Sequence, residues 1–143
     1  MEVLDLINSR PADGDDEVPA AVREVRTLAA RAVEAARHGG TPAPADVDRL
    51  NAIMRAAPAY PVLDGRTLTR ARDGSPAQQA AARLAEATAE LLASPSVTAI
   101  KQCAAPDCIQ LFLPANPRRQ WCSAARCGNR ARVARYYQRH RTV

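Results

Sequence analysis

Residues 103–130 read CAAPDCIQLFLPANPRRQWCSAARCGNR and contain all four cysteines of the chain. The cysteines form two matched pairs, Cys103 with Cys108 and Cys122 with Cys127, and each pair encloses four residues. Two such pairs suit a tetrahedral site in which four thiolates bind one zinc ion and leave no position open for catalysis. We therefore expect one structural Zn²⁺ held by these four cysteines; two disulfides or free buried thiols are the alternatives.

The residues around the cysteines predict a short hairpin followed by a helix. Ile109 to Leu113 is an apolar strand candidate, and Gln120 to Cys122 is expected to return antiparallel to it. Ser123 is placed to cap a final helix over about residues 124–140. Cys127 then lies in the first turn of this helix, where the positive end of the helix dipole lowers the pKa of a thiol. The expected layout is a treble-clef-like Cys₄ zinc module.

The preceding hundred residues are dominated by helical patterns. Residues 18–37 carry an apolar stripe at steps of three and four, and helices are also expected over about 45–56 and 76–93. Asp64-Gly65 indicates a hairpin within residues 60–72, whereas residues 1–8 could form a strand or a helical turn. The predicted fold is mainly α with a small β component: a helical domain, 1–98, and the zinc module, 99–143.

The net charge of +5 is unevenly distributed along the chain. Residues 1–100 contain 11 basic and 14 acidic side chains, whereas residues 101–143 contain 9 basic residues and a single acidic one, Asp107. A segment this basic favours a polyanionic partner, with double-stranded DNA as the leading candidate. A zinc-stabilised RNA-binding or protein-interaction adaptor, or a merely solvated basic face, are the alternatives.

Helical periodicity divides the arginines of the final helix into two groups. At 100° per residue, Arg132, Arg135 and Arg139 form one exposed ridge. Arg130 falls on a different side, where we expect it to face the cysteines and donate hydrogen bonds to backbone carbonyls. Arg118 and Arg119, in the turn before Trp121, add positive charge to the same module, and Tyr136 lies beside the ridge. The candidate DNA contacts are Arg118, Arg119, Arg126, Arg130, Arg132, Arg135, Tyr136 and Arg139.

Several functional classes find no support in the sequence. No apolar run approaches the ~20 residues of a membrane-spanning helix, and the first ten residues lack the apolar segment of a signal peptide. No phosphate-binding glycine loop or metalloprotease motif is present. We therefore expect a cytoplasmic protein that is not an enzyme and does not contact membranes.

The cysteine segment closely resembles the CGNR zinc-finger family. The matching residues are the two cysteine pairs, Leu111-Phe112-Leu113, Arg119-Gln120-Trp121-Cys122-Ser123 and Cys127-Gly128-Asn129-Arg130 itself. This resemblance implies that the four cysteines are zinc ligands and that the module binds DNA at the C-terminus of a bacterial transcription regulator.

Leu4-Asp5-Leu6-Ile7-Asn8-Ser9 is similar to the start of the ABATE domain that usually precedes a CGNR finger. That resemblance implies a stress-responsive or effector-sensing role for residues 1–98, with Asn8 as a candidate contact to a small-molecule effector. A turn cap is the alternative role for Asn8. Because one small module buries little area on DNA, we also expect a homodimer, formed through the apolar stripe of residues 18–37.

Overall fold

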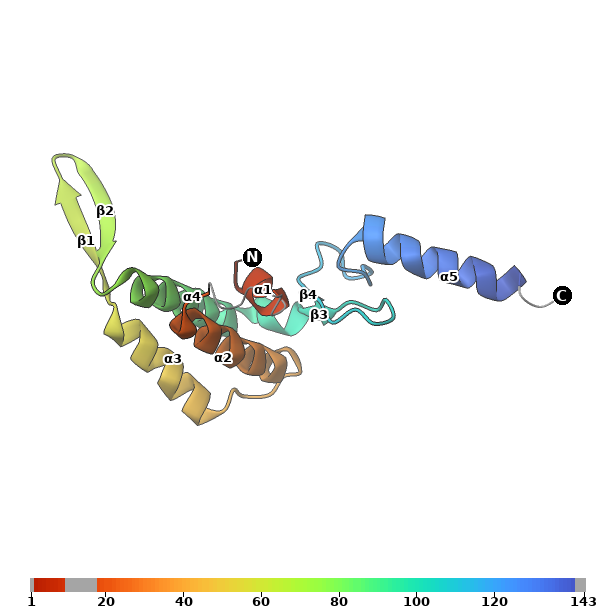
Figure 1. Cartoon of the computed structure of the whole chain (residues 1–143), viewed down its shortest axis with the longest axis horizontal. Helices are drawn as coiled ribbons and strands as arrows, with labels where there is room; N and C mark the ends of the chain where they lie inside the picture. Colours follow the sequence, from red (N-terminus) through yellow and green to blue (C-terminus); the bar gives the residue numbers. More distant parts are fainter. Residues whose placement is uncertain (1, 10–17, 141–143) are drawn as a thin grey trace.

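The computed structural model describes residues 2–9 and 18–140. Figure 1 shows an elongated molecule, with a hairpin projecting from one end of a helical body and the last helix extending from the other end. Helices predominate, and the strands of the described part form two small antiparallel sheets of two strands each. The predicted mainly α fold with a small β component is therefore confirmed.

Four helices build the body: α1 (Glu2–Asn8), α2 (Ala20–Arg37), α3 (Pro44–Ala56) and α4 (Pro76–Ala93). The first of these shows that residues 2–8 are a helix and not a strand. Helix α4 begins with a capping box. Ser75 Oγ accepts a hydrogen bond from Gln78 N (3.3 Å), and the Gln78 side chain accepts one from Ser75 N (2.8 Å). This reciprocal pairing satisfies two backbone donors at the start of the helix.

Small side chains allow α2, α3 and α4 to pack closely. Ala29, Ala32 and Ala85 are fully buried, and the larger core residues of this cluster are Val25, Leu28, Leu50 and Ile53. The apolar stripe of α2 is thus covered by helices of its own chain. The prediction that this stripe forms a dimer interface is wrong, because an amphipathic pattern does not tell whether its partner lies in the same chain or in another.

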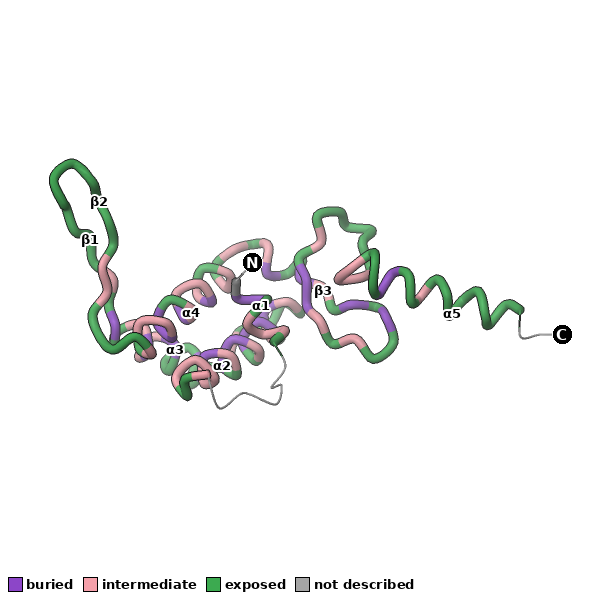
Figure 2. Tube along the Cα trace, turned by 45° about the horizontal axis from the view of Figure 1, so that its top comes forward, coloured by how far each residue is buried: buried purple, intermediate pink, exposed green. Residues whose placement is uncertain are grey.

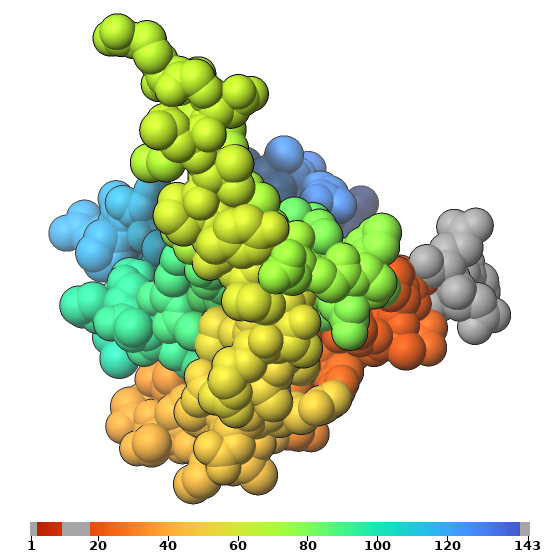
Figure 3. All heavy atoms as spheres, turned by 90° about the vertical axis from the view of Figure 1, so that its left-hand side faces the viewer, coloured from red at the N-terminus to blue at the C-terminus, as the bar shows by residue number. Residues whose placement is uncertain are grey.

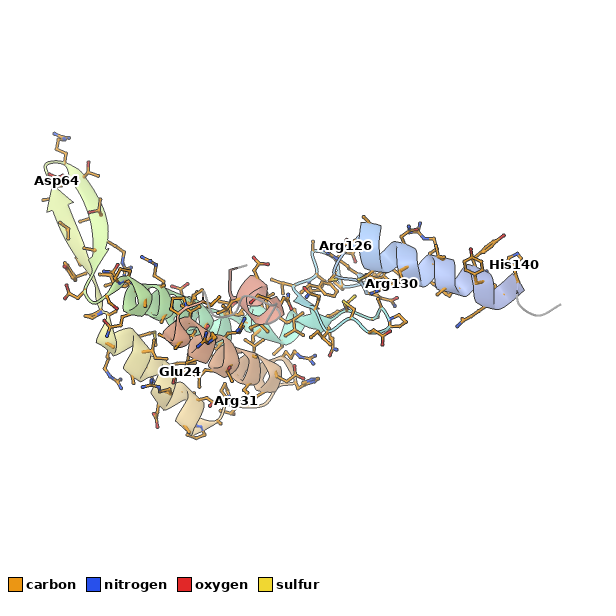
Figure 4. The ribbon with its side chains drawn as sticks, viewed as in Figure 1. Glu24, Arg31, Asp64, Arg126, Arg130 and His140 are labelled. Carbon is orange, nitrogen blue, oxygen red and sulfur yellow. The ribbon has the colours of Figure 1, made fainter. Side chains whose placement is uncertain are left out.

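Ion pairs join α2 to α3 outside the core. Arg31 pairs with Asp46 through two hydrogen bonds of 3.0 and 2.5 Å, and Arg49 pairs with Glu24 at 2.6 and 2.9 Å. Figure 4 labels Glu24 and Arg31 on the α2 surface that faces α3. Hydrogen bonding to Arg31 lowers the pKa of Asp46 below its usual value of 3.8.

Strands β1 (Ala59–Asp64) and β2 (Thr67–Arg72) form the predicted hairpin, with Asp64 opposite Thr67 in the register. Gly65 has a φ of +57°, a conformation that glycine adopts without strain. Figure 3 shows the hairpin standing clear of the body. Leu63 and Leu68 pair across its strands near the tip, and each is 70% exposed.

The remaining elements are η2 (Pro95–Ala99), β3 (Lys101–Gln102), β4 (Leu111–Phe112), the π-helical turn η3 (Ala124–Gly128) and α5 (Asn129–His140). The hairpin partner of β4 is β3, with Gln102 opposite Leu111. The expectation that residues 120–122 pair with this strand is wrong. Those residues form no strand, and Gln120 instead accepts a single backbone hydrogen bond from Ala104 N (2.9 Å).

The helical body and the cysteine-bearing segment share one hydrophobic cluster. Leu111 of β4 packs with α1 and α2 residues and with the 3₁₀ turn η2. The buried members of this cluster are Leu4, Val33, Ala36, Val97, Ile100 and Leu111. A boundary near residue 98 stays a prediction, but side chains on both sides of it are buried together.

Candidate metal centre and basic helix

The four cysteines converge at one point, although 24 positions separate the first from the last. Cys103 follows β3, and its N–H donates to Gln110 O (2.9 Å) across the β3–β4 hairpin. Cys108 closes a tight turn by donating to Ala105 O (3.2 Å). Asp107, just before Cys108, has a φ of +61°, a left-handed conformation that aspartate tolerates better than most residues.

The second pair is positioned by the start of the last helix. Ser123 Oγ accepts from Arg126 N (3.2 Å), as predicted for a cap, and Gly128 N donates to Ser123 O (2.9 Å). This hydrogen bond joins residues five positions apart and closes a π-helical turn, in which Cys127 is buried. Trp121 packs beside Gly128, since a Cβ added there would lie 3.6 Å from the indole. The Trp121 ring therefore packs against the turn that contains Cys127 and Gly128.

The sulfur geometry fits one zinc ion. The distances between sulfurs are 3.9 Å for Cys108 and Cys122, 3.6 Å for Cys122 and Cys127, and 3.7 Å for Cys127 and Cys108. All four sulfurs lie within 4.8 Å of one another. A tetrahedron with Zn–S bonds of about 2.3 Å has sulfur–sulfur edges of about 3.8 Å, whereas a disulfide requires about 2.05 Å. The cysteines are free thiols, so the two-disulfide alternative fails.

The pKa values show why the cluster suits a cation. Burial raises the pKa of Cys103, but hydrogen bonds from the backbone of Cys122 and Ala105 and from neighbouring thiols outweigh it and bring the pKa to about 7. Burial, together with the neighbouring thiols, raises the pKa of Cys122 to about 12. Burial also raises the pKa of Cys127. Four thiolates cannot share this space unless a metal cation offsets their mutual repulsion.

Two arginines lie against the cysteine cluster, and the contacts of both differ from expectation. Arg130 does face the cluster, but its hydrogen bond runs to Cys127 Sγ (3.7 Å) and not to a backbone carbonyl. Arg119 makes the carbonyl contacts: it donates to Trp121 O (2.8 Å) and to Cys122 O, and it lies 5.0 Å from the centre of the Phe112 ring. The sequence does not indicate this role, because turn residues have no periodicity that orients their side chains.

Helix α5 is almost entirely accessible. None of its residues is buried, and Figure 2 shows it exposed along nearly its whole length. Arg132, Arg135 and Arg139 are exposed, and no acidic residue follows Asp107 in the sequence. The guanidinium of Arg135 lies 5.9 Å from the centre of the Trp121 ring. Figure 4 places Arg126 and Arg130 at the start of α5 and His140 at its far end.

The other candidate contacts are Arg118, Arg126 and Tyr136. Arg118 and Arg126 are exposed, before and within the turn that leads into α5. Tyr136 is 57% exposed and stacks on His140, with ring centres 4.1 Å apart. Five of the predicted arginines thus lie in η3 and α5, and two of the predicted contacts, Arg119 and Arg130, are engaged by the cysteine segment.

Asn8 lies at the junction of the body and the cysteine segment. Its Nδ2 donates to Leu111 O and its Oδ1 accepts from Leu111 N, both at 2.8 Å, and Gln110 Nε2 donates to Asn8 O at 3.2 Å. The side chain of Asn8 therefore pairs with β4 as a neighbouring strand would. It also lines a pocket of about 650 Å³. A contact to an effector stays a prediction, whereas the pairing with β4 is a structural role that the sequence did not reveal.

Comparison with known proteins agrees with this geometry. Residues 99–140 match the CGNR zinc finger family, and residues 2–95 match the ABATE family, described as "Putative stress-induced transcription regulator". Neither description names an enzyme. No curated protein matches the sequence significantly, and no helix in the described ranges is both long and apolar enough to cross a membrane. The chain belongs to the ABATE family and ends in a CGNR zinc finger with a structural zinc site.

Proposed function

We propose that the protein is a zinc-dependent DNA-binding transcription regulator in which α5 contacts the DNA backbone. Cys103, Cys108, Cys122 and Cys127 hold the zinc, and the zinc fixes the turn from which α5 starts. The observation that carries the proposal is an exposed helix that starts from the turn holding Cys127. Its arginines have no acidic residue near them in the sequence. Phosphates are the natural partner of such a surface, because arginine donates several charge-assisted hydrogen bonds to them.

The isolation of α5 supports the same reading. A helix of 12 residues without a packed face has little intrinsic stability in water. Here Val133 and Tyr137 are 46% and 66% exposed, and positive charges repel one another along the helix. A polyanion would remove that repulsion and give the helix a surface to lie on. Arg118, Arg126 and Tyr136 extend the contact, whereas Arg119 and Arg130 primarily hold the cysteine segment.

We also propose that residues 2–95 sense an effector and pass its state to the finger. The shared cluster around Leu111 and the pairing of Asn8 with β4 support this, because they connect the two parts physically. A reducing cytoplasm would keep the four thiols available for zinc. Binding as a homodimer would double the DNA area, through a surface other than the buried stripe of α2.

Selection from a pool of random DNA duplexes tests the proposal. The zinc-loaded full chain should enrich a defined sequence motif and should bind it more tightly than it binds heparin or RNA of equal length. Equal binding to all three polyanions would contradict the proposal of sequence-specific regulation. Preferential retention of RNA would favour the RNA-binding alternative. A Cys122→Ser variant, which cannot complete the zinc site, should enrich nothing.

A further inference from the structure

A pocket of about 650 Å³ lies where α1, the end of α4, η2 and β4 meet. This volume falls within the range of about 300–1,000 Å³ typical of small-molecule sites. Its walls are largely apolar and come from both parts of the chain: Val3, Leu4 and Leu91 from the body, and Leu111 and Phe112 from β4. Cys122, one of the proposed zinc ligands, also lines it.

The charges around this pocket are unbalanced. Asp5 of α1 and Glu90 of α4 line it, both are exposed, and neither forms an ion pair with any residue in the part of the chain that the structure describes. Arg119 lines it too and offsets one of these two charges; its guanidinium is held on the Cys122 side by the Trp121 and Cys122 carbonyls and the Phe112 ring. Zinc bound by four thiolates has a net charge of −2, which adds to the negative field on the Cys122 side.

We infer that this pocket binds an organic ammonium ion with an apolar body. The apolar part would pack against Leu4, Leu91 and Phe112, and the ammonium group would lie beside Asp5 and Glu90. The inference deepens the proposed function, since its regulatory meaning rests on effector sensing by this protein. A ligand that contacts α1 and β4 at once would stabilise their docking, and β4 pairs with β3, the strand that leads directly into Cys103.

Three probes that share one apolar body test the charge preference. The zinc-loaded full chain is titrated by calorimetry, without DNA, with 4-phenylbutylamine, 4-phenylbutan-1-ol and 4-phenylbutyrate at neutral pH. The amine should bind about tenfold more tightly than the alcohol, in line with a charge interaction near a protein surface, and the carboxylate should bind most weakly. Equal affinities, preferential binding of the carboxylate, or no binding of the amine would overturn the inference.

Variants locate the site. The double substitution Asp5→Asn and Glu90→Gln should weaken the amine about tenfold and leave the alcohol unchanged, because it removes charge and keeps shape. The control, Asp48→Asn with Asp64→Asn, removes two exposed carboxylates outside the pocket and should leave all three affinities unchanged. Amine binding that survives the first pair, or that the control pair abolishes equally, would place the amine elsewhere and overturn the inference.

DNA binding is measured separately on the same preparations. If the amine binds as expected and no duplex is retained, the proposed function fails while the pocket assignment stands. If a duplex is retained and the amine does not bind, the pocket assignment fails while DNA binding stands.

Discussion

The side chain of Asn8 forms two hydrogen bonds of 2.8 Å with the backbone of Leu111, 103 positions later in the sequence. One amide group thus satisfies both the N–H and the C=O of a buried residue. This contact joins the first helix of the body to β4, the strand that lies between the two cysteine pairs. We expect this connection to make the stability of one part depend on the other.

We predict that Asn8→Ala destabilises the protein by about 1–3 kcal/mol, because it leaves the backbone groups of Leu111 without these partners. Urea unfolding followed by circular dichroism measures the change. Asn51→Ala serves as the control, because Asn51 lies on α3 away from this contact. An Asn8→Ala variant as stable as the Asn51→Ala variant would show that the pairing contributes nothing.

Removing zinc should destabilise the helical body as well as the finger. Leu111 is buried with Leu4 and Val33, so loss of the zinc-ordered hairpin opens the shared cluster. Zinc at 1,000 times its Kd should raise the unfolding free energy by about 4 kcal/mol if the two parts unfold together. Trp121, the only tryptophan, reports the finger by fluorescence, and circular dichroism reports the helices.

Chelation that shifts the emission of Trp121 and leaves the urea midpoint of the helices unchanged would contradict this coupling. The Asn8→Ala variant provides an internal check. With the pairing removed, zinc should stabilise the body less than it does in the unsubstituted protein.

The Arg31–Asp46 pair should make stability depend on pH in a defined direction. Hydrogen bonding to Arg31 holds the pKa of Asp46 below 3.8, so the pair stabilises the fold above that pH. The contribution is lost as the pH falls through the lowered pKa. Asp46→Asn should therefore reduce stability at neutral pH, and the difference from wild type should shrink in acid.

The control for this experiment is Asp48→Asn, on the same helix and exposed. The free energy of unfolding in urea is compared at neutral and acidic pH. All variants lose zinc in acid, so this loss cancels when one variant is compared with another. A penalty for Asp46→Asn that persists unchanged below pH 3.8, or that matches the Asp48→Asn penalty, would exclude the assigned role.

Local signals in the sequence predicted much of the fold. Ser75-Pro76 and Asp64-Gly65 specify a helix start and a turn through chemistry confined to a few neighbouring residues, and both elements formed as expected. Cysteine spacing likewise predicted the metal site, because ligand pairs are set by short loops.

What the sequence could not predict depends on contacts between distant segments. Asn8 pairs with Leu111, and the apolar stripe of α2 is buried by its own chain. The β3–β4 pairing is local, but β3 has only two residues and is too short for a periodic pattern. The exchange of roles between Arg119 and Arg130 has a related cause. Their neighbours are fixed by how the cysteine segment folds around the cluster, and no periodic pattern encodes that arrangement.

The salt dependence of DNA binding tests the central claim most directly. The affinity of the zinc-loaded protein for duplex DNA should fall with salt by a log–log slope of about 0.9 per phosphate contacted. Changing Arg132, Arg135 and Arg139 to glutamine should reduce that slope by about 2–3. The charge-matched variant with Arg55, Arg66 and Arg83 changed to glutamine should keep the wild-type slope. Equal slopes for the two variants would contradict the claim that α5 contacts the phosphates.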